Sequence, residues 1–131
     1  MAVALGSNLG DRERHLAAAR AALAALPGTR IVRLSTVEET APLGGLDQPP
    51  YLNQVAQLET TLDPRALLDA CQAIERAEGR TRGTRWASRS LDIDIIQFGR
   101  RHVAEPGLTI PHPELPNRDF WQRGLAEVQN P

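Results

Sequence analysis

Two acidic residues, Asp92 and Asp94, stand two positions apart in a segment that is otherwise apolar (L-D-I-D-I-I, 91–96). This alternation predicts a β-strand, because successive side chains of a strand leave from opposite faces. The two carboxylates then share one face, while the apolar residues turn toward a core. Mg²⁺ is typically held by one or two carboxylates, with substrate phosphates and water completing its coordination. The pair is a candidate polyphosphate site, and the alternative is an ordinary solvent-facing strand.

The segment that precedes this strand is rich in arginine. Residues 76–101 contain seven arginines and three acidic residues, a local balance of +4 in a chain whose net charge is −1. All 15 basic residues of the chain are arginine, which excludes a Walker A lysine and a Schiff-base lysine. Phosphate groups would therefore be bound by guanidinium groups, which suit bidentate contacts. The pattern favours an anionic ligand, and the alternative is a solvated charged loop.

Three further side chains are candidates with competing structural explanations. Gln72 and Glu75 share one face of a predicted helix, opposite its apolar stripe, and taken alone they are expected to be exposed to solvent. Cys71 falls within the apolar stripe, so a buried structural thiol is expected rather than a nucleophile. His112 lies between two prolines that restrict its orientation, and the three histidines do not have a zinc-binding spacing.

Aromatic residues are few, at 4% of the chain, and they flank the predicted loops and the late segment. Tyr51, Trp86, Phe120 and Trp121, four of the five aromatic residues, are placed in this way. This placement is consistent with stacking on a flat ring, and the alternative is a set of small local cores.

The elements that must position these residues follow from periodicity and turn signals. We expect strands over 2–5, 30–38, 51–62 and 91–96, and helices over 11–26, 63–79 and 117–128. Long loops cover 40–50 and 80–89, and the chain after Gly99 is expected to be irregular. The order of the first six elements predicts an α+β fold, a ferredoxin-like split βαβ sandwich. Its helices would cover one face of a mostly antiparallel sheet and leave the other face to the loops.

Length and composition bound the remaining possibilities. At 131 residues the chain is expected to form a single domain, 1–131. One cysteine excludes an internal disulfide, and no apolar run is long enough for a signal peptide or a membrane span. The net charge of −1 provides no positive electrostatic field that would attract nucleic acid. We therefore expect a cytoplasmic protein without membrane or nucleic-acid partners.

Several stretches together resemble one protein family. They are A-L-G-S-N-L-G-D-R at 4–12, P-L-G-G-L-D-Q-P-P-Y-L-N at 42–53, Q-A-I-E at 72–75, G-R-T-R at 79–82, R-W-A-S-R-S-L-D-I-D-I-I at 85–96, L-T-I-P-H-P at 108–113 and N-R-D-F at 117–120. In this order and over nearly the whole chain, the sequence resembles the 6-hydroxymethyl-7,8-dihydropterin pyrophosphokinases of folate biosynthesis. The chain ends at Pro131, about where relatives continue, so the domain is expected to be short at its C-terminus.

The resemblance implies the ferredoxin-like fold and a reaction between two small molecules. Pyrophosphate passes from the co-substrate ATP to the hydroxymethyl group of the pterin, and AMP is released. It also implies that Asp92 and Asp94 hold two Mg²⁺ ions between the ATP phosphates, with Asp94 as a possible base. Arg82 and Arg89 would clamp the phosphates during the reaction. We expect a monomer.

By the same resemblance, two groups of residues bind the substrates. The expected ATP-binding residues are Gln72, Glu75, Arg80, Ile95, Thr109, His112 and Arg118. The expected pterin-binding residues are Thr40, Leu43, Tyr51, Asn53, Trp86 and Phe120, with the ring stacked between Tyr51 and Phe120.

Two other hypotheses remain. A ferredoxin-like module can present its open sheet to RNA through aromatic side chains, although here the strands carry paired acids instead. The chain could also be a slow homologue that binds nucleotide without efficient turnover.

Overall fold

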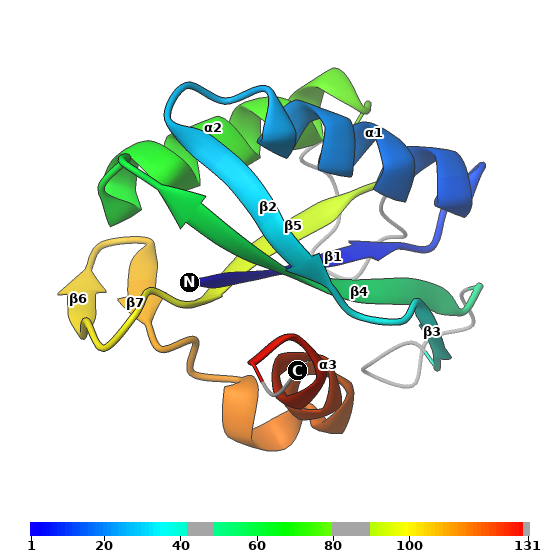
Figure 1. The fold of residues 1–131 in the computed structure, drawn as a ribbon. Helices are drawn as coiled ribbons and strands as arrows, with labels where there is room; N and C mark the ends of the chain where they lie inside the picture. The colour runs from blue at the N-terminus through cyan, green and yellow to red at the C-terminus, as the bar shows by residue number, and fades with distance from the viewer. Residues whose placement is uncertain (42–48, 80–89, 130–131) are drawn as a thin grey trace.

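The computed structural model describes residues 1–41, 49–79 and 90–129. In chain order its elements are β1 (Ala2–Ser7), α1 (Arg12–Ala24), β2 (Thr29–Leu34), β3 (Glu38–Thr40), β4 (Tyr51–Thr60), α2 (Pro64–Ala77), β5 (Asp92–Gln97), β6 (Val103–Glu105), β7 (Leu108–Ile110), a 3-10 turn (Leu115–Asn117) and α3 (Asp119–Gln129). Figure 1 shows the arrangement of these elements.

The main sheet has the strand order β2-β4-β1-β5, and every neighbouring pair is antiparallel. The short strand β3 continues beside β4 beyond the end of β2. With α1 after β1 and α2 after β4, this is the predicted split βαβ order. The α+β fold with a mostly antiparallel sheet is thereby confirmed.

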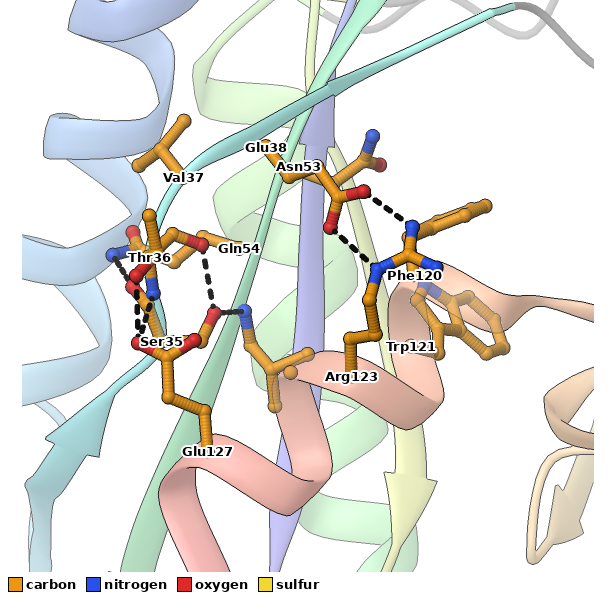
Figure 2. A pocket seen from close by; sticks show the side chains of 12 residues that line it. Ser35, Thr36, Val37, Glu38, Asn53, Gln54, Phe120, Trp121, Arg123 and Glu127 are labelled. Carbon is orange, nitrogen blue, oxygen red and sulfur yellow. Dashed lines mark hydrogen bonds and ion pairs between the residues drawn. The ribbon is translucent and has the colours of Figure 1, made fainter.

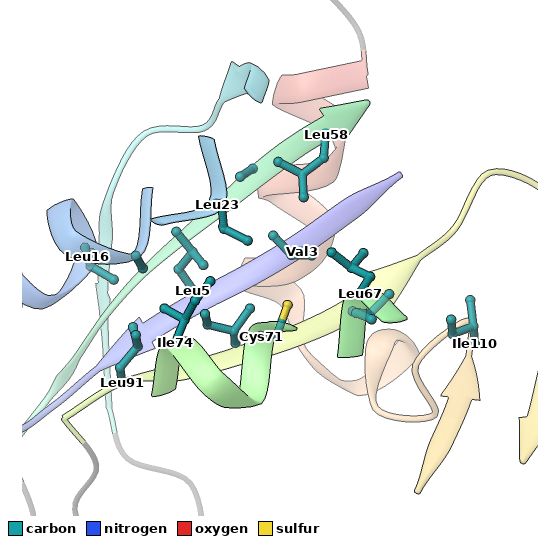
Figure 3. Packing of buried hydrophobic residues seen from close by; sticks show 14 of the residues in the cluster. Val3, Leu5, Leu16, Leu23, Leu58, Leu67, Cys71, Ile74, Leu91 and Ile110 are labelled. Atoms are coloured by element: carbon teal, nitrogen blue, oxygen red, sulfur yellow. The ribbon is translucent and has the colours of Figure 1, made fainter. Parts of the chain in front are cut away.

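Helices α1 and α2 begin at the residues that the sequence indicates. Asp11 caps α1 by accepting a hydrogen bond from the Arg14 main-chain nitrogen. Asp63 caps α2 in the same way through Ala66, and Pro64 occupies the first turn. Both helices pack on one face of the sheet, where Leu16, Leu23, Leu67, Cys71 and Ile74 meet the β-strand residues Val3, Leu5 and Leu58 (Figure 3).

The third helix lies on the other face, so the expectation that helices cover only one face was wrong. Trp121, Leu125 and Val128 of α3 form a second core with Ala4 and Val55 of the sheet. Figure 1 shows α3 on the opposite side of the sheet from α1 and α2.

Two local expectations were also wrong. The predicted strand over 30–38 is divided, because Ser35 interrupts the ladder: its hydroxyl accepts a hydrogen bond from the Val55 main-chain nitrogen. The region after Gly99 contains the hairpin β6–β7, whose turn uses Gly107 at φ +73°. Its strands have three residues each, too few to show an alternating pattern.

The close packing of α3 on the sheet predicts the effect of Gly124→Ala. A Cβ at this position would lie 2.4 Å from Val55 Cγ2 and 2.9 Å from Val55 Cβ. We expect a loss of about 1–3 kcal/mol in the free energy of unfolding, measured by urea denaturation. The double variant Gly124→Ala/Val55→Ala should lose less than the sum of the two single changes. Additive losses would contradict this packing.

Candidate functional site

The strand register places Asp92, Gly6 and Asn53 in one row across β5, β1 and β4. Neighbouring strands are about 4.8 Å apart, so the Cα atoms of Asp92 and Asn53 are roughly 10 Å apart. Gly6 lies between them and carries no side chain. The row therefore places a carboxylate and an amide on the two strands that flank Gly6.

The second carboxylate, Asp94, lies opposite Ala4, another small residue of β1. Asp94 Oδ1 is 3.7 Å from His112 Nε2, which is longer than a hydrogen bond. The other ring nitrogen of His112, Nδ1, accepts a hydrogen bond of 3.0 Å from the Glu114 main-chain nitrogen. In the neutral ring Nε2 therefore carries the proton. This N–H group lies on the side of the ring that faces Asp94.

Trp121 holds two of the predicted ATP-binding residues next to each other. Its ring meets the edge of His112 at a centroid distance of 4.8 Å, and the guanidinium carbon of Arg118 lies 4.3 Å from its centroid. Trp121 is buried, so both polar side chains rest on a fixed surface. Sequence reasoning had noted this tryptophan without assigning it this role, although its spacing of three from Arg118 on a helical turn was a usable signal.

Glu75 is buried, with 5% of its surface exposed, so the prediction of an exposed position was wrong. Its Oε2 accepts a hydrogen bond of 2.7 Å from the main-chain nitrogen of Ile93. The reason is that β5 is an edge strand, whose outward N–H groups need acceptors from elsewhere. Gln72, one turn earlier on α2, is half-buried. Glu75 thus fixes β5, and with it both aspartates, against α2.

The pKa of the Cys71 thiol depends on its burial and on the acidic residues near it. Burial, together with the negative charges of Glu75 and Asp94, raises the pKa of Cys71 to about 12. The thiol is therefore protonated and buried, which agrees with the structural role predicted for it.

On the other side of Gly6, Asn53 donates a hydrogen bond of 2.6 Å from Nδ2 to Thr40 Oγ1. A Cβ added to Gly6 would lie 3.3 Å from Asn53 Oδ1 and 3.5 Å from Tyr51 Cδ1. Both side chains therefore lie directly over the glycine. The absence of a side chain at Gly6 makes this close approach possible.

Phe120, on α3, and Asn53, on β4, line the same cavity of about 250 Å³ between α3 and the segment 35–38 (Figure 2). The helix thus brings an aromatic side chain to the pterin-binding residues predicted on the sheet.

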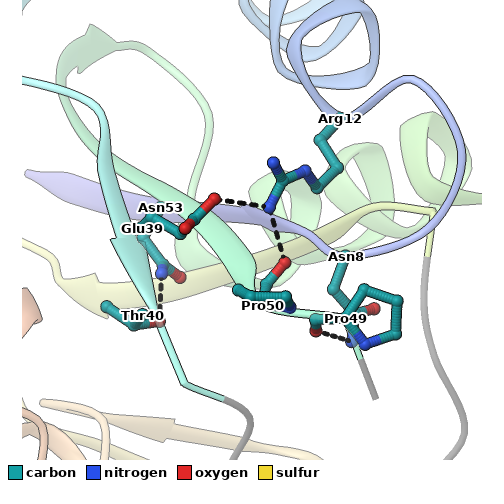
Figure 4. Close-up of polar contacts among 7 residues, drawn as sticks. All are labelled: Asn8, Arg12, Glu39, Thr40, Pro49, Pro50 and Asn53. Atoms are coloured by element: carbon teal, nitrogen blue, oxygen red, sulfur yellow. Dashed lines mark hydrogen bonds and ion pairs between the residues drawn. The ribbon is translucent and has the colours of Figure 1, made fainter.

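The segment after β1 anchors both ends of the loop that begins after Thr40. Asn8 Nδ2 donates to the Pro49 carbonyl at 3.2 Å. Arg12 Nη1 donates to the Pro50 carbonyl at 2.8 Å and to Glu39 Oε2 at 3.0 Å (Figure 4). Because Glu39 precedes the loop and Pro50 follows it, one guanidinium joins its two ends.

The remaining predicted residues are placed as follows. The side chain of Ile95 is buried in the core, so only its main chain can meet a ligand, and Thr109 is exposed on β7. Leu43, Arg80, Arg82, Trp86 and Arg89 lie outside the described residues.

Asp92 and Asp94 fit a magnesium ion by the chemistry of their donor set. Within residues 1–41, 49–79 and 90–129, no group of three or more His, Cys, Asp and Glu side chains is placed to hold a metal. Two carboxylates on one strand face are sufficient for Mg²⁺ when phosphates supply further oxygens, whereas a structural zinc site would need four ligands.

The chain matches the family model described as 7,8-dihydro-6-hydroxymethylpterin-pyrophosphokinase (HPPK) over residues 2–130. It is similar to three bacterial proteins named 2-amino-4-hydroxy-6-hydroxymethyldihydropteridine pyrophosphokinase. The identity is 45% to the Haemophilus influenzae protein, over 96% of this chain and 79% of that protein. It is 45% to the Pseudomonas aeruginosa protein, over 96% and 78%. For the Bacillus subtilis protein it is 40%, over 96% and 75%.

The buried hydrogen bond of Glu75 predicts different effects for two substitutions. Glu75→Leu removes the acceptor and leaves the Ile93 N–H buried without it, so we expect a loss of about 1–3 kcal/mol in the free energy of unfolding. Glu75→Gln retains an acceptor oxygen of the same shape and should lose less. Urea denaturation of both variants measures the difference. Equal stability of the two variants would contradict the role of Glu75 as a partner of β5.

Proposed function

The chain belongs to the 7,8-dihydro-6-hydroxymethylpterin-pyrophosphokinase family, and on this premise we propose how its own residues carry the reaction. It transfers pyrophosphate from ATP to the hydroxymethyl group of 6-hydroxymethyl-7,8-dihydropterin in folate biosynthesis, and AMP is released. The observation that supports the residue assignment is the row Asp92–Gly6–Asn53, since it sets a carboxylate and an amide on one face of the sheet.

The pterin ring is bound over β4 and β3. Asn53 and Thr40 read its hydrogen-bonding edge, together with the main chain at Leu43. Tyr51 and Phe120 stack on its two faces, and Trp86 closes over it. The position of Tyr51 and Asn53 over Gly6 supports this orientation, because the hydroxymethyl group then extends across β1 toward the carboxylates.

The ATP phosphates are bound beside β5. Asp92 and Asp94 hold Mg²⁺, with two ions in our proposal, and the bound metal would neutralise charge on the phosphate oxygens. His112, which lies beside Asp94, and Arg118, which rests on the Trp121 ring, donate to the nucleotide. Gln72, Glu75, Arg80, Ile95 and Thr109 complete the proposed ATP site, Glu75 by holding β5 and Ile95 through its main chain.

The transfer itself is a single displacement at the β-phosphorus of ATP. The hydroxymethyl oxygen forms the new P–O bond while the bond from the β-phosphorus to the oxygen of the α-phosphate breaks. AMP leaves with that electron pair, and the hydroxyl proton passes to Asp94. Arg82 and Arg89, which lie outside the described residues, clamp the phosphates as charge moves onto AMP. Catalysis then depends on positioning and electrostatic stabilisation, without a covalent intermediate.

The broader setting is also part of the proposal. Among the described residues, no helix is long and apolar enough to cross a membrane. We propose a cytoplasmic monomer that acts on its two small-molecule substrates and has no nucleic-acid partner. The acidic pair on the open sheet face disfavours the RNA-binding alternative, because it would repel a phosphate backbone.

The metal assignment is tested with Asp92→Asn. We expect the rate of AMP formation from ATP and the pterin to fall on the order of 10²-fold or more, as for other losses of electrostatic stabilisation. Chromatography separates AMP from ADP in the product. Removal of Mg²⁺ by a chelator should abolish turnover of the unchanged chain, and added Mg²⁺ should restore it.

The matched control is Asp69→Asn, an identical change at an exposed position of α2, which should leave the rate unchanged. Formation of ADP instead of AMP would contradict the reaction. Full activity of Asp92→Asn would contradict the metal site.

A further inference from the structure

We propose that the ion pair between Glu38 of β3 and Arg123 of α3 is a positioning device that sets pterin affinity by holding Phe120 against the sheet. This inference rests on the proposed function, because it takes Phe120 and Asn53 as pterin-binding residues. The pair itself contacts neither the reacting atoms nor the proposed metal ligands.

Two hydrogen bonds make up this ion pair, and they join residues that are 85 positions apart in the chain. Arg123 Nε donates to Glu38 Oε2 at 3.3 Å, and Arg123 Nη2 donates to Glu38 Oε1. A guanidinium that engages both carboxylate oxygens fixes orientation as well as distance, which a single-point contact does not. Figure 2 shows the pair bridging the strand and the helix.

Each end of the pair adjoins a residue of the proposed pterin pocket. Glu38 is the Cα partner of Asn53 in the β3–β4 register. Arg123 follows Phe120 by three positions on α3, so their side chains lie on the same side of the helix. All four residues line the same cavity, which Thr36 and Glu127 also line on the side away from Phe120 in Figure 2. The pair therefore joins the helix that carries Phe120 to the strand that faces Asn53.

The ion pair between Glu38 and Arg123 adds a directional contact between α3 and β3. α3 packs on the sheet through apolar contacts, among them Gly124 against Val55, and apolar burial is non-directional. β3 has three residues and pairs only with β4 among the described strands. The side chains of Arg123 and Glu38 thus complete a triangle between α3, β3 and β4 at the end of the helix nearest to Phe120.

The pair is solvent-exposed, with 57% of the Arg123 side chain and 37% of the Glu38 side chain accessible. Exposed ion pairs contribute little to global stability because water screens them. Its loss should therefore alter ligand binding while the melting temperature changes little. A generally structural role would give the opposite result.

The chain offers a matched control two turns from Phe120 on the same helix. Glu127 Oε1 accepts hydrogen bonds from the Thr36 main-chain nitrogen at 2.8 Å and from Thr36 Oγ1 at 2.7 Å. This contact also joins α3 to the segment before β3. A helix rises 1.5 Å per residue, so Glu127 lies about 10 Å along the helix from Phe120. Loss of the contact between Glu127 and Thr36 should therefore leave KM for the pterin unchanged.

The test compares steady-state kinetics of Glu38→Gln, Arg123→Gln and Arg123→Lys with the unchanged chain. We expect KM for the pterin to rise roughly three- to tenfold in the two glutamine variants, with KM for ATP and kcat within about twofold. Arg123→Lys keeps the charge and loses the two-point contact, so its effect should be intermediate. The charge-reversed double variant Glu38→Arg/Arg123→Glu should recover most of the pterin affinity.

Two reference variants separate the possible failures. If Phe120→Ala raises KM for the pterin while the Glu38 and Arg123 variants do not, the positioning role is overturned and the proposed function stands. If Phe120→Ala leaves that KM unchanged, the pterin assignment of Phe120 fails and the inference fails with it. An equal rise in Glu127→Gln, or a parallel change in KM for ATP, would show a general structural effect and would also overturn the proposal.

Discussion

The register of β1 between β4 and β5 is the constraint on which the candidate site depends. Because side chains alternate along a strand, a slip of one residue would turn Asp92 and Asp94 into the core and bring Ile93 to the open face. The register is held by apolar burial on both sides: Val3 and Leu5 face α1 and α2, and Ala4 faces α3. The same packing that stabilises the fold therefore fixes which strand residues can meet a ligand.

The residues of β1 that face the site are small, and this determines what the open face can hold. Gly6 allows Asn53 and Tyr51 to lie over the strand, and Ala4, opposite Asp94, packs in the core beneath α3. Around the site the supporting contacts come from other elements. Glu75 satisfies the free edge of β5, Trp121 supports His112 and Arg118, and Arg12 joins the ends of the loop before β4. The proposed metal ligands and Asn53 thus lie on strands of the sheet. The supporting residues Glu75, Trp121 and Arg12 lie on helices.

Local patterns were sufficient to predict much of this arrangement. The alternation at 91–96 predicted the strand and the shared face of Asp92 and Asp94, and cap residues located two of the helices. The face chosen by α3 depends on Gly124 meeting Val55, and the burial of Glu75 depends on β5 being an edge strand. Both are pairings between distant residues, which periodicity along one segment does not reveal. Of the loop predictions, Arg82, Arg89 and Trp86 lie outside the described residues and stay predictions.

The central claim is that the pterin and the metal-bound phosphates meet on one face of the sheet, across Gly6. Paramagnetic relaxation tests it directly, with Mn²⁺ in place of Mg²⁺, a non-hydrolysable ATP analogue and the pterin bound together. We predict strong relaxation of the pterin protons, corresponding to a distance of roughly 10 Å or less from the metal. This relaxation should be lost in Asp92→Asn. Unrelaxed pterin protons in the unchanged chain, or relaxation that persists in the variant, would contradict the account.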